Sequence, residues 1–110
     1  MRGVVTLPPD LSPSIARLLL VEARDVSVAD APSVVVGSVR AADVPLVPGS
    51  AIPFELEVPE AASGHTLALR AHASLDGSER VAPGDSISTV SLPLPDTGDV
   101  PSIEVPLRAV

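Results

Sequence analysis

A chain of 110 residues that is 45% hydrophobic is long enough to bury one core and too apolar to be disordered, despite its 13 prolines. Its net charge of −7, with seven basic residues that are all arginine, disfavours binding to nucleic acid or to an acidic membrane. Because the chain has no cysteine, it has neither a disulfide framework nor a thiolate metal site nor a thiol nucleophile.

Clusters of proline and glycine divide the sequence into short runs in which apolar and polar residues alternate. Alternating residues place their side chains on opposite faces of a β-strand, and several short strands in succession are typical of a sandwich or barrel. In chain order we expect strands at residues 3–7, 17–26, 33–40, 51–58, 65–74, 86–92 and 103–110, a short returning strand at 79–82, a loop over 41–50 and tight turns at Asp76-Gly77 and Pro83-Gly84.

The segment 51–58 shows the clearest alternation. Its apolar side chains, which we expect to face the core, are Ile52, Phe54, Leu56 and Val58. The opposite face carries Glu55 and Glu57, so this strand is half-buried. Pro53 has no N–H to donate to a neighbouring strand, which predicts that the strand lies at the edge of a sheet.

Two later segments repeat this alternation. The side chains expected to point inward are Leu67, Leu69, Ala71, Ala73, Ile103, Val105 and Leu107, and those expected to point outward are Thr66, Ala68, Arg70, His72, Glu104, Pro106 and Arg108. Residues 13–22 could instead form a helix capped by Ser12 or Ser14, but the strand pattern continues through Val26. We therefore predict an all-β fold over residues 1–110: a single antiparallel β-sandwich of about seven or eight strands, immunoglobulin-like or transthyretin-like.

The sequence contains few groups suited to catalysis or metal binding. Gly84-Asp85-Ser86 has the residue types of a nucleophile motif, but no histidine follows it, and we interpret it as a turn in which Asp85 accepts local N–H groups. His65 and His72 are seven residues apart, so a strand sends them to opposite faces. Since His72 shares its face with Arg70 rather than with a carboxylate, we expect an exposed surface histidine and not a metal ligand.

The remaining candidate groups also favour structural roles. Glu55 and Glu57 fall on a flat outer face, where charge protects an edge strand from aggregation. Asp25 and Asp30 flank a turn and are interpreted as caps. The inward Phe54 leaves no aromatic platform for a sugar or a base, and the P-x-x-P match at residues 45–48 is common by chance. We therefore expect no catalytic, cofactor-binding or metal-binding residues and no enzymatic activity.

Several short strings follow one another in the order of a known family. They are the string Asp25-Val26-Ser27-Val28-Ala29-Asp30-Ala31-Pro32 with the valine run after it, Pro53-Phe54-Glu55-Leu56, Arg70-Ala71, Asp76-Gly77, and the closing Val- and Leu-rich segment 103–110. In these strings the chain resembles the YbaY-type lipoprotein family, which includes the YscW-like pilotin chaperones of type III secretion. The resemblance implies a small β-sandwich of the bacterial cell envelope, usually lipid-anchored through a cysteine that follows a signal peptide. For the pilotins it implies binding to a secretin subunit.

This resemblance leads us to expect a non-catalytic protein-interaction domain of the bacterial cell envelope, chaperone-like or pilotin-like, that binds an envelope protein or a secretin-like peptide segment without a cofactor. The alternative is a structural, self-associating β-sandwich without a peptide ligand, and a homo-oligomer is left open. No signal peptide is visible, so we expect the periplasm or cell envelope if one has been trimmed and the cytoplasm otherwise. Contact with a membrane is expected only through an anchor that this sequence does not show.

Overall fold

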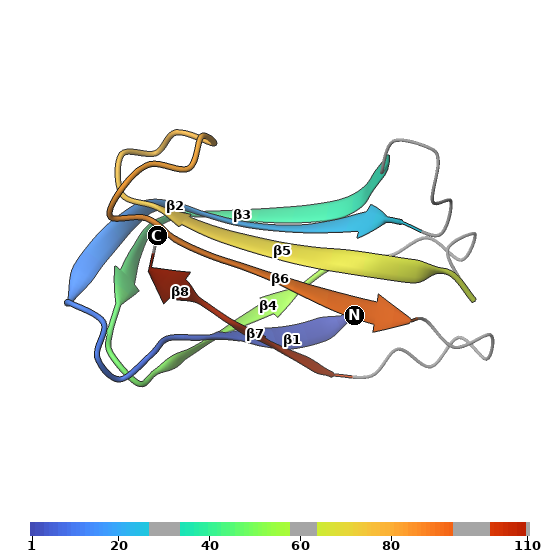
Figure 1. Cartoon of the computed structure of the whole chain (residues 1–110), viewed down its shortest axis with the longest axis horizontal. Coiled ribbons are helices and arrows are strands. Elements are labelled where there is room, and N and C mark those ends of the chain that lie inside the picture. The colour runs from blue at the N-terminus through green and yellow to red at the C-terminus, as the bar shows by residue number, and fades with distance from the viewer. Residues whose placement is uncertain (27–33, 58–63, 94–101, 110) are drawn as a thin grey trace.

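The computed structural model describes residues 1–26, 34–57, 64–93 and 102–109, and in these residues it contains strands and no helix (Figure 1). The strands are β1 (Arg2–Thr6), β2 (Ser14–Asp25), β3 (Val34–Leu46), β4 (Ala51–Glu55), β5 (Thr66–Ser74), β6 (Ser86–Pro93), β7 (Ile103–Pro106) and β8 (Arg108–Ala109). They form a sheet of order β4-β1-β7 and a sheet of order β3-β2-β5-β6-β8, which face each other. The predicted all-β sandwich is confirmed. Within the described ranges no helix is long and apolar enough to cross a bilayer.

One pair of neighbouring strands departs from the predicted antiparallel arrangement. All pairs in the described strands are antiparallel except β1 and β7, which run parallel from Gly3 opposite Ile103 to Thr6 opposite Pro106. Parallel neighbours cannot be joined by a short hairpin, and β1 and β7 lie near opposite ends of the chain. The alternation of apolar residues does not reveal strand direction, so this pair could not be read from it.

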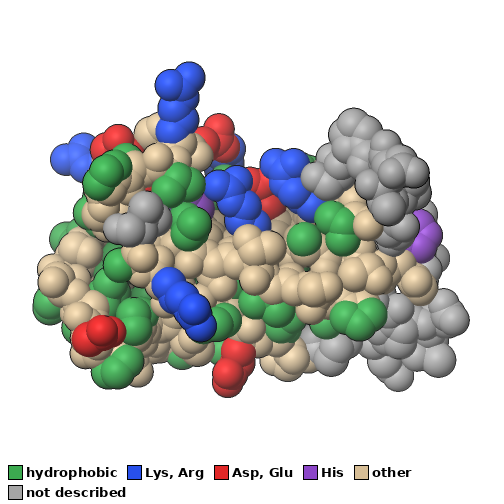
Figure 2. All heavy atoms as spheres, in the orientation of Figure 1, with side chains coloured by type: hydrophobic (Ala, Val, Ile, Leu, Met, Phe, Trp, Pro, Cys, Tyr) green, Lys and Arg blue, Asp and Glu red, His purple; other side chains and the backbone are tan. Residues whose placement is uncertain are grey.

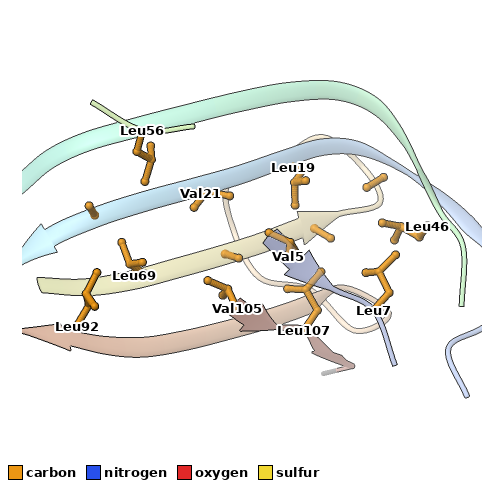
Figure 3. Packing of buried hydrophobic residues seen from close by; sticks show 14 of the residues in the cluster. Val5, Leu7, Leu19, Val21, Leu46, Leu56, Leu69, Leu92, Val105 and Leu107 are labelled. Atoms are coloured by element: carbon orange, nitrogen blue, oxygen red, sulfur yellow. The ribbon is translucent and has the colours of Figure 1, made fainter. Parts of the chain in front are cut away.

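The core lies between the two sheets and consists of small aliphatic side chains (Figure 3). The inward residues predicted on β5, Leu67, Leu69, Ala71 and Ala73, are all 0% exposed. Leu56, Val105 and Leu107 are buried as predicted, and Ile52, Phe54 and Ile103 pack against the core while partly exposed. Truncating one of these buried leucines to alanine is expected to cost about 2–5 kcal/mol.

The sheet edges match the prediction made from proline. Pro53 lies in β4 and Pro106 in β7, and these two strands are the outer strands of the three-stranded sheet. At an edge, a residue without an N–H removes no hydrogen bond from the interior of the sheet. Val58, the fourth apolar residue predicted in this pattern, and the turn around Asp30 lie outside the described residues.

The predicted loop over 41–50 and the alternative helix over 13–22 are both wrong, for the same reason. Strand β2 begins at Ser14, and β3 pairs with it as far as Leu46 opposite Ser14. A long central strand needs partners for its backbone groups on both sides, and this pairing overrides local turn signals such as Pro45. The turn is confined to Pro48 and Gly49, where Gly49 has a φ of 73°.

The tight hairpin predicted at Asp76-Gly77 and the short strand at 79–82 are also wrong. Residues 75–85 form one irregular connection between β5 and β6, which rises above the five-stranded sheet in Figure 1. Gly77 does adopt the positive φ expected of a turn glycine, 84°, and Pro83-Gly84 forms the predicted turn. The connection is held by side chains of its own and of β5 rather than by strand pairing.

Gly3 allows the three-stranded sheet to close around the only aromatic ring of the chain. In the pairing, Gly3 lies opposite Phe54 on one side and Ile103 on the other. A Cβ atom built on Gly3 would come within 2.6 Å of both Phe54 Cζ and the carbonyl oxygen of Ile103. The Phe54 ring therefore occupies the space that a side chain at this position would need.

We expect the substitution Gly3→Ala to lower the free energy of unfolding by about 1–3 kcal/mol, because the added methyl group must displace both the ring and a backbone carbonyl. Urea denaturation measures this change. The control Ala42→Ser alters an exposed residue of β3 and should stay within about 0.5 kcal/mol of the wild type. Equal stability of Gly3→Ala and wild type would contradict the packing of Phe54 over Gly3.

Candidate functional site

The connection between β5 and β6 covers one end of the outer face of the five-stranded sheet. His72 lies on that face, in register with Leu20 of β2 and Ile87 of β6. Asp85 stands at the end of the connection, and its Oδ2 lies 2.9 Å from Nε2 of His72. Both side chains are 2% exposed. The two groups form a buried pair that fixes the end of the connection to β5.

The prediction that His72 is an exposed surface histidine is therefore wrong. The alternation of side chains along the strand correctly predicted that His72 lies on the outer face, away from the core side of β5. The alternation could not reveal that residues 75–85 fold over that face. This connection brings the carboxylate of Asp85, 13 positions further along the chain, to His72.

Asp85 also organises the backbone of the connection, as the sequence predicted for this residue. Its Oδ1 accepts the N–H of Leu75 at 3.0 Å, and its Oδ2 accepts the N–H of Ala82 at 2.9 Å. Burial by itself would raise the pKa of Asp85, but the hydrogen bonds from His72 and from these two N–H groups outweigh it. The net effect is a pKa below the usual value of 3.8.

Asp76 makes a second, more exposed arrangement of the same kind. Its Oδ1 accepts the N–H of Ser78 at 2.8 Å and the hydroxyl of Ser74 at 2.9 Å. The hydrogen bond from Ser78, followed by that from Ser74, lowers the pKa of Asp76. Together Asp76 and Asp85 shape the connection through short-range contacts typical of aspartate in turns.

The geometry of the His72–Asp85 pair indicates a clamp rather than a reaction centre. Solvent does not reach either group, and Nδ1 of His72 is buried with no hydrogen-bond partner in the described residues. Ser86, the third residue of the possible nucleophile motif, is 2% exposed. A substrate would have to displace the whole connection to reach these atoms, so their evident role is to hold it in place.

Beside this connection, the outer face of the five-stranded sheet carries a hollow of about 430 Å³. We call it the arginine hollow, and its lining residues are Leu20, Glu22, Arg24, Val35, Ser38, Arg40, Arg70 and Glu79. Figure 2 shows arginine and acidic side chains gathered next to the raised connection. The alternation of side chains predicts Arg70 on an outer face but does not reveal the hollow, which depends on the strand order β3-β2-β5.

Two ion pairs occupy part of the arginine hollow. Arg24 Nη2 lies 3.1 Å from Glu22 Oε2, and Glu22 is almost completely buried. Arg40 of β3 donates to Glu79 in the β5–β6 connection, so this pair joins the connection to the far edge of the sheet. Because the Arg40–Glu79 pair is exposed, it contributes only about 0–1 kcal/mol, and the buried Asp85 hydrogen bonds are the stronger attachment of the connection.

The other residues considered in the sequence do not gather into a site. His65 Nδ1 lies 2.6 Å from Oδ2 of Asp25, and both groups are partly exposed. Glu55 lies 3.8 Å from Arg2 on the surface, and Glu57 is exposed. In the described part of the chain no group of three or more histidine and carboxylate side chains could hold a metal ion.

A long sheet edge is the remaining candidate surface. Among the described strands, β3 has 13 residues and is bonded only to β2, whereas the other edge strands, β4, β7 and β8, have 5, 4 and 2 residues. Two of its apolar side chains, Val34 and Val35, are 62% and 45% exposed.

Comparison of the chain with family models, curated proteins and solved structures finds no match.

The Asp85 clamp predicts a specific dependence of stability on pH. Because the folded pKa is lower than the unfolded one, the carboxylate stabilises the fold fully above its unfolded pKa, and this contribution is lost as the pH falls through the lower folded value. We expect Asp85→Asn to unfold about 1–3 kcal/mol more easily at pH 7, because an amide cannot accept all three donors.

Urea denaturation between pH 7 and pH 2 measures this effect. The difference between wild type and Asp85→Asn should shrink as the pH falls below the usual aspartate range. Asp10→Asn removes the same charge from an exposed turn and should preserve both the stability and its pH profile. A gap between wild type and Asp85→Asn that stays constant over the whole range would contradict the assignment.

Proposed function

We propose that this chain is a non-catalytic protein-interaction domain of the bacterial cell envelope, chaperone-like or pilotin-like, that binds an extended segment of its partner along the free edge of β3. The observation that carries this proposal is the length of that edge: 13 residues of strand that pair on one side only within the described part of the chain. An extended peptide adds to such an edge by forming main-chain hydrogen bonds, and side-chain contacts then select its sequence.

The contrast among the sheet edges supports this choice. Proteins usually protect an exposed edge by making it short or by placing proline or charge in it. The edges at β4 and β7 are short and contain Pro53 and Pro106, and β8 has only two residues. In β3, Asp43 with a φ of 52° and Pro45 lie near one end, and the register with β2 shifts at Val36, between Val35 opposite Arg24 and Gly37 opposite Ala23. Residues 34–42 thus form an edge without proline that is interrupted by a bulge at Val36.

The side chains of this edge favour an apolar contact. Val34 and Val35 are the exposed large hydrophobic residues of β3, and Val26, which follows β2, is 40% exposed. A peptide strand placed beside β3 would cover part of this surface and gain from its removal from water. The envelope location and the chaperone-like role rest on the resemblance in the strings 25–32 and 53–56.

A second copy of the chain could occupy the same edge, which is the alternative of a self-associating structural module. Sedimentation distinguishes the two proposals. A monomer at micromolar concentration leaves the edge free for a peptide, whereas a stable dimer that disappears when the edge is blocked would favour the alternative.

The test uses paired proline variants, Ala41→Pro and Ala42→Pro, in the exposed part of β3. Neighbouring N–H groups of a strand point to opposite sides, so one of the two donates to β2 and the other is free. The variant that keeps wild-type stability in urea carries its proline at the free position.

Nine-residue peptides selected from a randomised display library serve as probes. We expect micromolar binding to the wild type and at least tenfold weaker binding to the stable proline variant. Two versions of each peptide can be methylated on alternate backbone nitrogens, one on the odd and one on the even positions. Only the version whose methyl groups replace the N–H groups that bond to β3 should lose affinity. Selected peptides that bind the stable proline variant as tightly as the wild type would rule out the edge of β3 as the docking site.

A further inference from the structure

We propose that the arginine hollow on the outer face of the five-stranded sheet is a binding site for a carboxylate group, which the guanidinium of Arg70 holds. This inference goes beyond the peptide-binding edge and does not require it. The edge would bind through backbone groups of β3, whereas the hollow binds through side chains of β2, β3 and β5.

Arginine side chains are concentrated in this hollow. The chain carries a net charge of −7 and has seven arginines, of which Arg24, Arg40 and Arg70 line this one hollow. The pairing of the strands brings them together, since Arg40 lies opposite Leu20, and Arg70 lies opposite Glu22. Guanidinium groups in a concave, partly desolvated site attract anions more strongly than they do on a flat surface.

Arg70 itself has no hydrogen-bond or ion-pair partner in the described residues. The two glutamates of the hollow form ion pairs with the other two arginines: Glu22 with Arg24 at 3.1 Å, and Glu79 with Arg40. Arg70 faces Glu22 in the register but forms no hydrogen bond or ion pair with it. A half-buried guanidinium without a hydrogen-bonded anion is unfavourable, and a ligand carboxylate, which matches its fork of N–H donors, would remove that cost.

The balance of charge selects the kind of anion. Among the described lining residues, three arginines against Glu22 and Glu79 leave one net positive charge. A single carboxylate neutralises it, whereas a phosphate dianion would place an excess negative charge beside two carboxylates. Leu20 and Val35 add an apolar lining for a short aliphatic stem. The matching ligand is therefore a carboxylate on a few carbon atoms, as in a small carboxylic acid or a glutamate side chain.

NMR titration of the full chain with three probes tests this inference: butyrate, the blocked tripeptide acetyl-Ala-Glu-Ala-amide, and inorganic phosphate at pH 7.5. We expect the carboxylate probes to shift the amide signals of Ser38, Arg40 and Arg70. Arg70→Gln should weaken the binding at least tenfold, while Arg2→Gln, which removes an exposed arginine of β1, should not change it.

The opposite change is expected when a competing carboxylate is removed. Glu79→Gln frees Arg40 and raises the charge of the hollow by one, so carboxylate binding should become several-fold tighter. If Arg70 and Glu79 only stabilised the fold, Arg70→Gln would not weaken carboxylate binding while Glu79→Gln strengthened it. Urea denaturation of each variant verifies that the fold is retained.

The two carboxylate probes distinguish the source of the ligand. Tighter binding of the tripeptide than of butyrate supports a glutamate of a protein partner, and the reverse order supports a small carboxylic acid. Phosphate binding as strong as that of the carboxylates would overturn the inference, as would unchanged binding in Arg70→Gln or equal binding of the matched peptide acetyl-Ala-Gln-Ala-amide. Because none of these probes needs the edge of β3, failure here leaves the proposal for that edge untouched.

Discussion

The pairing of β2 on both sides is the constraint on which the rest of the structure depends. This strand bonds to β3 from Ser14 to Asp25 and to β5 from Leu18 to Asp25. Since side chains alternate along a strand, the register that buries Leu19, Val21 and Ala23 in the core also turns Leu20, Glu22 and Arg24 outward. A shift by one residue would expose the core face and dismantle the arginine hollow together.

The chain has a single Phe and neither Tyr nor Trp, so large rings contribute little to its packing. Close contact between the backbone and Phe54, and hydrogen bonds from buried polar side chains, contribute to the packing instead. Phe54 packs directly over Gly3, so the single ring needs no deep pocket. The connection of residues 75–85, which has few apolar residues to bury, is held by Asp85 through two backbone N–H groups and His72. Buried polar groups are stabilising when their hydrogen bonds are satisfied; both oxygens of Asp85 are satisfied, whereas Nδ1 of His72 has no partner in the described residues.

The two proposed binding surfaces share one strand but use different parts of it. The free backbone of β3 would receive an extended segment, while Val35, Ser38 and Arg40 on its outer face contribute to the arginine hollow. The β5–β6 connection reaches the same strand through Glu79, so a group that displaces Glu79 from Arg40 would also loosen that connection. The hollow and the connection are therefore linked through Arg40 on the outer face of β3.

The sequence by itself determined the sandwich, the faces of β4, β5 and β7, the edge position of Pro53, and the turn role of Asp85. These features follow from alternation and from the chemistry of single residues. The tertiary structure decided the length of β3, the parallel pairing of β1 with β7, the burial of His72, and the meeting of Arg24, Arg40 and Arg70. Alternation states which way a side chain points, but not which strands become neighbours or which connection folds over a face. Those outcomes depend on contacts between residues far apart in the chain, and no local pattern records them.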